Sequence, residues 1–183
     1  AGIEPAEAVA ASAASRLGAP VATDLFGAGL PAGSFDAVLV WDVIEHLPDP
    51  RRALDEVARV LRPGGVLSVV TPDIGSLAAR LLGRRWEEMR KMPEHIYFFD
   101  RASLSTLLRS AGFEPVEWGT VGKRMSLQET LSRLAPAAPW LWGTALVLAR
   151  ALGLHRLVAY FDPRWKLAVV ARLTKPAGEA AGS

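Results

Sequence analysis

The sequence predicts an α/β fold with a largely parallel sheet, and three observations support this prediction. Residues Ala37–Trp41 form a short, unbroken apolar run between polar residues, which is typical of a strand buried on both faces. Acidic residues follow this run, and open α/β sheets bind ligands at the carboxyl ends of their strands. Strand and helix signals alternate along the chain, which favours parallel strands joined by right-handed crossover helices.

The composition fits a single domain and narrows the function classes. The chain has 183 residues, 50% of them hydrophobic, which is enough for one domain with a substantial core. The absence of cysteine excludes disulfides and thiolate metal sites and fits a reducing compartment, so we expect a cytoplasmic protein. The net charge of +2 is too small to indicate a nucleic-acid partner, and we expect none.

The N-terminal residues indicate a strand, a helix and a second strand. Residues 2–4 suit the end of a strand, and Pro5 suits the first position of a helix that runs to Leu17 and stops at Gly18. Residues 20–24 suit a short strand that ends in a carboxylate. The chain starts without Met or a signal-peptide pattern, so we expect it to begin within a domain.

Caps and turns place the later elements. Asp49-Pro50 is a strong helix start, and the helix that follows leads to a buried strand at 66–71. Asp100 suits the N-cap of a helix that runs through Ala111. Two further strands are expected at 113–118 and 166–173.

Five motifs, in this order and spacing, resemble the class I S-adenosylmethionine-dependent methyltransferases, near the ubiquinone-pathway O-methyltransferases. The motifs are Gly2-Ile3-Glu4, Phe35-Asp36-Ala37-Val38, Asp42-Val43-Ile44-Glu45-His46-Leu47, Leu61-Arg62-Pro63-Gly64-Gly65, and Phe98-Phe99-Asp100 through Ala111-Gly112-Phe113. The resemblance covers roughly residues 1–120 and the strand 166–173. It implies S-adenosyl-L-methionine as cofactor and a Rossmann-like class I methyltransferase sheet with helices on both faces.

The resemblance also implies a strand order and a missing part. Strand 166–173 should lie antiparallel between strands 66–71 and 113–118, and a vacancy should separate the two N-terminal strands from strand 36–41. In the family, a first strand, a glycine-rich turn and a first helix would precede residue 1. We therefore expect an N-terminally truncated methyltransferase domain over residues 1–174, inactive as given, with a disordered tail at 175–183.

The resemblance assigns the cofactor residues. Glu4 would accept hydrogen bonds from the ribose hydroxyls, Asp24 would accept from the adenine amino group, and Leu25 would pack near the ring. Trp41, Asp42 and Val43 would border the methionine part of the cofactor. Local alternatives remain for three of these residues: Glu4 at a helix start, Asp24 in a turn, and Trp41 in the core.

Polar residues beyond strand 36–41 are candidates for metal binding and catalysis. Asp42, Glu45 and His46 stand at i, i+3 and i+4, and the resemblance implies magnesium there. The alternative, which we favour, is that Glu45 and His46 order the turn through hydrogen bonds and no metal binds. His95 and Tyr97 fall in the region that covers the acceptor in the family. His95 is the candidate general base, with a purely structural histidine as the alternative.

The expected function is methyl transfer to a small-molecule, glycan or lipid-linked acceptor. The alternative is a non-catalytic methyltransferase-like domain that serves as a binding or scaffold protein. Residues 136–161, within an insertion at about 124–163, are strongly apolar and flanked by arginines. They suit either a helical cover over the acceptor pocket or an amphipathic segment that contacts the inner membrane surface peripherally.

Overall fold

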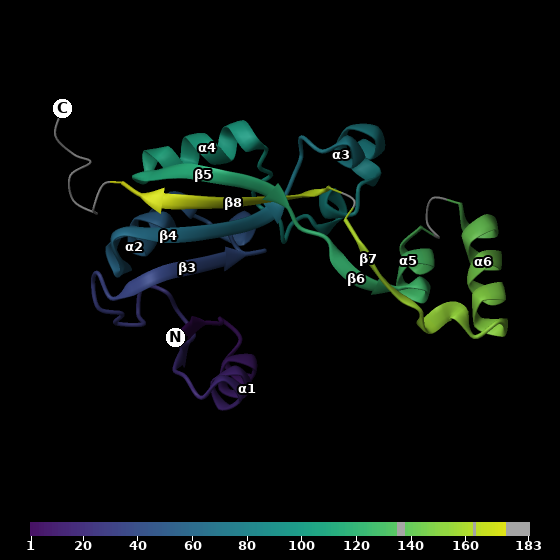
Figure 1. Ribbon diagram of the computed structural model, residues 1–183, viewed down its shortest axis with the longest axis horizontal. Helices are drawn as coiled ribbons and strands as arrows, with labels where there is room; N and C mark the ends of the chain where they lie inside the picture. Colours follow the sequence, from purple (N-terminus) through teal and green to yellow (C-terminus); the bar gives the residue numbers. More distant parts are fainter. Residues whose placement is uncertain (135–137, 163, 175–183) are drawn as a thin grey trace.

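A computed structural model describes residues 1–134, 138–162 and 164–174. Its main sheet has four strands in the order β3–β4–β8–β5 (Figure 1). These strands are β3 (Phe35–Trp41), β4 (Leu61–Pro72), β5 (Phe113–Thr120) and β8 (Lys166–Leu173). β3 and β4 are parallel, whereas β8 runs antiparallel to both β4 and β5. The predicted α/β class, the order of these four strands and the orientation of β8 are therefore confirmed, and the sheet is mixed.

The N-terminal strands form a separate parallel pair. These elements are β1 (Gly2–Ile3), α1 (Glu7–Leu17) and β2 (Val21–Ala22), and β1 pairs with β2 alone among the described residues. The prediction that Pro5 begins the helix is wrong. A carboxylate oxygen of Glu4 accepts a hydrogen bond from the backbone N–H of Ala6 at 3.0 Å, and this turn keeps Ala6 extended, outside the helix.

The crossover between β3 and β4 follows its sequence signals. Helix α2 (Pro50–Val60) has Pro50 in its first turn, and the Asp49 side chain accepts from the backbone N–H of Arg52 at 2.9 Å. β4 starts at Leu61, earlier than predicted. Leu61 already pairs with Phe35 of β3, and the pairing is then irregular until Val66 pairs with Ala37. The crossover carries the chain back so that β3 and β4 end at the same edge of the sheet.

The core lies between this sheet and two helices, α2 and α4 (Arg101–Ser110). Asp100 caps α4 as predicted, in a capping box with Ser103. The buried apolar residues of the cluster come from both helices and from strands β4, β5 and β8, and they include Leu54, Val57, Leu67, Leu104, Leu108, Phe113, Val169 and Leu173. This core holds the strand ends that carry the candidate site.

The segment between β4 and α4 has only short helices: α3 (Leu77–Leu82), η2 (Gly83–Arg85) and η3 (Glu88–Lys91). Its sequence is charged and aromatic and shows no clear period. Trp86, between η2 and η3, is nevertheless fully buried. We infer that this buried side chain anchors the segment that leads to His95.

Residues 123–161 form a distal unit beyond the edge at which β3 and β4 end (Figure 1). The unit comprises β6 (Lys123–Ser126), α5 (Leu127–Leu134), α6 (Pro139–Ala151), η4 (Leu154–Arg156) and β7 (Val158–Phe161). β6 pairs antiparallel with β7, and α5 packs against α6. The predicted helices are present, but the β6–β7 ribbon was not expected, and it holds the helices beyond the sheet. The expected disordered tail, 175–183, and residues 135–137 and 163 of the predicted insertion lie outside the described residues.

Candidate functional site

The chain turns sharply where β3 ends. Asp42 has a φ of 53°, in the left-handed region that aspartate tolerates better than most non-glycine residues. Its backbone N–H donates to the carbonyl of Val70 at 2.8 Å, and its carboxylate forms an ion pair with Nζ of Lys166 at 2.5 Å. This turn directs residues 43–46 across the strand ends.

Trp41, the last residue of β3, is on the surface. Its side chain is 55% exposed, and its indole N–H donates to Oγ of Ser68 at 3.0 Å. Trp41 therefore lies outside the core that the described residues form. Val43 is also exposed. Both side chains remain available to contact a ligand at this edge.

Glu45 joins three segments at the site. It lies in η1 (Ile44–His46), is only 1% exposed, and accepts a hydrogen bond at 2.9 Å from the hydroxyl of Thr71 at the end of β4. Its backbone carbonyl accepts from the N–H groups of Ile96 and Tyr97. Burial raises the pKa of the Glu45 carboxyl, and the hydrogen bonds only partly oppose this shift. Glu45 thus orders the turn through hydrogen bonds, which is the role that we favoured over metal binding from the sequence.

The raised pKa of Glu45 predicts a specific pH dependence of stability. A carboxyl whose pKa is raised by folding destabilises the folded state at pH values above its unfolded-state pKa, because the unfolded chain ionises it more readily. This cost is absent below the unfolded-state pKa of about 4.3, grows as pH rises from there to the folded-state pKa, and stays constant at higher pH. Glu45→Gln keeps an acceptor for Thr71 but cannot ionise. We expect the free energy of unfolding of the variant, relative to wild type, to increase as pH rises above about 4.

Urea unfolding at several pH values measures this difference. Thr71→Val serves as a second variant, because loss of the hydroxyl removes a group that favours the ionised carboxylate. Its stability should fall more steeply with rising pH than that of wild type. A difference between Glu45→Gln and wild type that stays constant with pH would show that Glu45 does not carry this cost.

Two histidines meet beside Glu45. The rings of His46 and His95 lie edge to face with centroids 4.6 Å apart. Nδ1 of His46 is 2.8 Å from the carbonyl oxygen of Glu94, so this nitrogen carries a hydrogen and donates it to that carbonyl. His95 is buried, and its Nδ1 has no hydrogen-bond partner in the described part of the chain. Burial lowers the pKa of His95, although the charge of Glu88 opposes this, so the imidazole is neutral at neutral pH.

The structure changes the metal set that the sequence suggested. One ligand atom from each of Glu45, His46 and His95 lies within 4.8 Å of the others, whereas the carboxylate of Asp42 pairs with Lys166. His95 is far along the chain from the other two, so no sequence spacing could have indicated it. One carboxylate and two imidazoles suit a transition metal better than magnesium, which prefers oxygen ligands.

The adenosine-side candidates lie on the separate N-terminal pair. The carboxylate of Glu4 accepts from Ala6, as described above, and that of Asp24 accepts from the backbone N–H of Gly27 at 2.6 Å. Both contacts match the local alternatives, a helix start and a turn. Leu25 is half-buried. No strand pairing in the described residues joins this group to Trp41 and Asp42.

Tyr97 borders the same cluster as His95. Its hydroxyl donates to the carbonyl of Pro48 at 3.3 Å, and its ring stacks on Phe99 at a centroid distance of 6.0 Å. The structure therefore brings Glu45, His46, His95 and Tyr97 together at the carboxyl ends of β3 and β4. In the sequence, Glu45 and His46 belong to one motif, whereas His95 and Tyr97 fall in a separate region that the resemblance placed over the acceptor.

Comparison with known proteins identifies the family. The pattern of the family described as "Methyltransferase domain" matches residues 2–117. A probable S-adenosylmethionine-dependent methyltransferase of Mycolicibacterium smegmatis is 40% identical over 85 residues, which are 46% of this chain and 31% of that protein. A ubiquinone biosynthesis O-methyltransferase of Cereibacter sphaeroides is 34% identical over 102 residues, 52% of this chain and 40% of that protein.

A solved structure gives the same result. The crystal structure of a Thermotoga maritima protein, described as a SAM-dependent methyltransferase and possible histamine N-methyltransferase, superposes with a TM-score of 0.58. It is 25% identical and covers 94% of this chain and 72% of that chain. The chain itself spans about a third to two fifths of the length of the curated relatives above. This chain therefore belongs to the class I S-adenosylmethionine-dependent methyltransferase family, with a distant relation to the ubiquinone O-methyltransferases.

Proposed function

We propose that this chain forms part of the site of a methyltransferase that transfers a methyl group from S-adenosylmethionine to a small-molecule, glycan or lipid-linked acceptor. The observation that carries the proposal is the polar cluster of Glu45, His46 and His95 at the carboxyl ends of β3 and β4, in which Glu45 and His95 are buried. Polar groups are costly to bury, and in open α/β sheets this edge is where ligands bind.

The residues fit the cofactor that the family uses. Carboxylates such as Glu4 and Asp24 accept hydrogen bonds from ribose hydroxyls and an adenine amino group, and both follow parallel strands. The exposed side chains of Trp41 and Val43, with Asp42 between them, suit the methionine part. When bound, the cofactor supplies the electrophilic methyl group, so the protein mainly has to hold and orient the reactants.

We also propose that one further strand completes the sheet. Among the described residues, β1 pairs only with β2, and β3 pairs only with β4, so each has an open edge. Leu39 and Trp41 of β3 are exposed. A strand between β1 and β3 would pair with both edges and bring Glu4 and Asp24 into the same sheet as Asp42. The domain would then have the Rossmann-like sheet expected for residues 1–174.

His95 is our candidate for proton removal from the acceptor, and Tyr97 for contact with it. The neutral imidazole with an unpartnered Nδ1 can accept a proton, which general base catalysis requires. The side chain is buried, so the acceptor would have to reach it from the cluster side. O-methylation needs such a base more than methylation of a neutral amine does.

Cofactor binding is the first test, with S-adenosylhomocysteine as the probe and the full-length protein that contains this sequence. Calorimetry should detect binding to wild type. Glu4→Ala should weaken it by about 1–3 kcal/mol, or about 5- to 150-fold, because bound hydroxyls would lose a charged acceptor. Glu7→Ala, in the first turn of α1, is the matched control and should bind like wild type.

Two results would revise the proposal. Equal affinity of Glu4→Ala and wild type would show that Glu4 serves only the turn that precedes α1. An absence of binding to wild type would favour the alternative function, a non-catalytic methyltransferase-like scaffold.

A further inference from the structure

The distal unit exposes an unusual amount of apolar surface. Trp140 is 78% exposed, and further large apolar residues of α6 and of the segment after it are also on the surface: Leu141, Val147, Leu148, Leu152, Leu154, Leu157, Val158 and Tyr160. A helix in water normally carries polar residues on its outer face. Arg150 is the only charged residue of α6.

The exposed residues of α6 share one face. Trp140, Thr144, Val147 and Leu148 follow at i, i+4, i+7 and i+8 and form an exposed helical stripe. The opposite face, with Ala149 buried, packs on α5. Both faces of α6 are thus apolar, although only one has a partner in the described structure.

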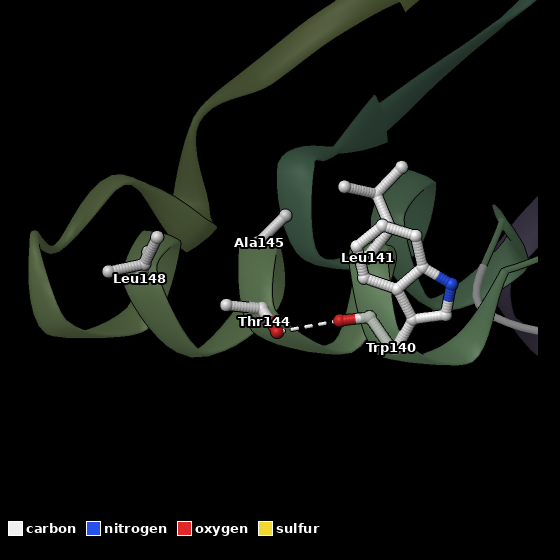
Figure 2. A pocket seen from close by; sticks show the side chains of 5 residues that line it. All are labelled: Trp140, Leu141, Thr144, Ala145 and Leu148. Atoms are coloured by element: carbon white, nitrogen blue, oxygen red, sulfur yellow. Dashed lines mark hydrogen bonds between the residues drawn. The ribbon is translucent and has the colours of Figure 1, made fainter.

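The outer face also has a shallow apolar pocket of about 220 Å³. Figure 2 shows Trp140 and Leu141 at one end and Leu148 at the other, with Thr144 and Ala145 between them. The one hydroxyl in this group, that of Thr144, donates to the carbonyl of Trp140 at 2.6 Å and so offers no unsatisfied donor. The pocket therefore suits a hydrocarbon chain rather than a polar ligand.

Basic residues occur in the same unit, on β6, near the end of α6 and in η4. Arg124, Arg150 and Arg156 are exposed and form no ion pair within the described residues. Two acidic residues lie in or next to the unit, and both accept hydrogen bonds from nearby residues. Glu129 accepts from Ser126, and Asp162, just after β7, accepts from Thr120. The unit thus carries uncompensated positive charge as well as exposed apolar groups.

We propose that the distal unit binds the surface of an anionic lipid bilayer through the outer face of α6. Apolar side chains with a tryptophan would enter the headgroup boundary, and the arginines would contact anionic headgroups. No helix in the described ranges is long and apolar enough to cross a membrane, so the contact is peripheral. The unit extends beyond the sheet, so it can reach a flat surface without burying the strand ends (Figure 1).

Charge favours a bilayer over a second copy of the chain. A two-fold dimer through this face would bring the same patch of each copy together, and with it the same arginines. Like charges at close range oppose such a contact, whereas an anionic surface complements them. The inference concerns binding alone and does not depend on methyl transfer.

Co-sedimentation with vesicles tests the proposal on the full-length protein. Wild type should pellet with phosphatidylcholine vesicles that contain phosphatidylglycerol and bind phosphatidylcholine alone at least about tenfold more weakly. Trp140→Ala/Leu148→Ala should reduce partitioning by at least about tenfold. Arg150→Gln/Arg156→Gln should reduce binding to the anionic vesicles specifically, as should about 1 M salt, which shortens the Debye length to about 3 Å.

The matched control is Leu77→Ala/Leu81→Ala, because both leucines of α3 are as exposed as the replaced residues. This variant should bind like wild type. Circular dichroism verifies folding, which truncation of exposed side chains should leave intact. The proposal is overturned if wild type binds neither kind of vesicle. It is also overturned if Trp140→Ala/Leu148→Ala binds as strongly as the control Leu77→Ala/Leu81→Ala. It is also overturned if sedimentation velocity shows a dimer that Trp140→Ala/Leu148→Ala dissociates.

Discussion

Trp86→Ala should lower the free energy of unfolding by about 3–5 kcal/mol, a large part of the roughly 5–15 kcal/mol that stabilises a typical domain. Trp86 is 0% exposed and is the largest fully buried side chain in the described structure. Its removal leaves a cavity in a segment with little regular structure, which can open locally. Urea unfolding gives the loss directly.

The same variant should also change the environment of His95. The backbone N–H of His95 donates to the carbonyl of Lys91, in the helical turn that follows Trp86, so loosening this segment should admit water to the imidazole. Because burial lowers the pKa of His95, hydration should raise that pKa toward its ordinary value of about 6.5. Titration by NMR measures this rise.

Two further variants separate packing from other effects. Trp86→Phe keeps most of the volume and removes an indole N–H that has no partner in the described residues, so it should cost less than Trp86→Ala. Met92→Ala changes an exposed side chain close by and should stay within about 0.5 kcal/mol of wild type. A loss below about 1 kcal/mol for Trp86→Ala would contradict the proposed anchor.

Phe113→Ala should destabilise the protein by a similar amount, about 3–5 kcal/mol. Phe113 is 1% exposed and lies opposite Leu173 where β5 and β8 pair, within the main core. The variant removes an aromatic ring from the contact between the sheet and α4, which cannot close over the cavity without moving the helix.

Val116→Ala, on the same strand, is the control for Phe113→Ala. Val116 is 56% exposed, so its truncation should cost less than about 1 kcal/mol. Denaturant unfolding of both variants provides the comparison. Equal losses would mean that the inner face of β5 contributes no more than its outer face, contrary to the structure.

Sequence reasoning was accurate where the signal and its effect are close in the chain. Asp49 and Asp100 cap helices α2 and α4 as predicted, because a cap depends on backbone groups only a few residues away. The apolar runs of β3 and β8 likewise became strands of the main sheet. Errors of a few residues at the start of α1 and β4 arose from one local hydrogen bond and one irregularity of pairing.

The site was only partly predictable. Glu4, Asp42 and His95 were chosen because of the family resemblance, and no hydrogen bond or measured contact in the structure tests their proposed roles. The resemblance correctly placed β8 between β4 and β5, which no local pattern in the sequence could have done. It did not indicate the β6–β7 ribbon or the exposed face of α6.

The sequence by itself determined the α/β class, the helix starts at Asp49 and Asp100 and the strand that ends at Trp41, because each depends on neighbouring residues. Only the tertiary structure decided that His95 lies against His46, that Asp42 pairs with Lys166, and that Trp86 is buried. Asp42 and Lys166 are 124 residues apart in the chain. Such partners meet because the core packs the sheet against its helices, and the energy of that packing is shared by the whole domain rather than encoded in any one motif.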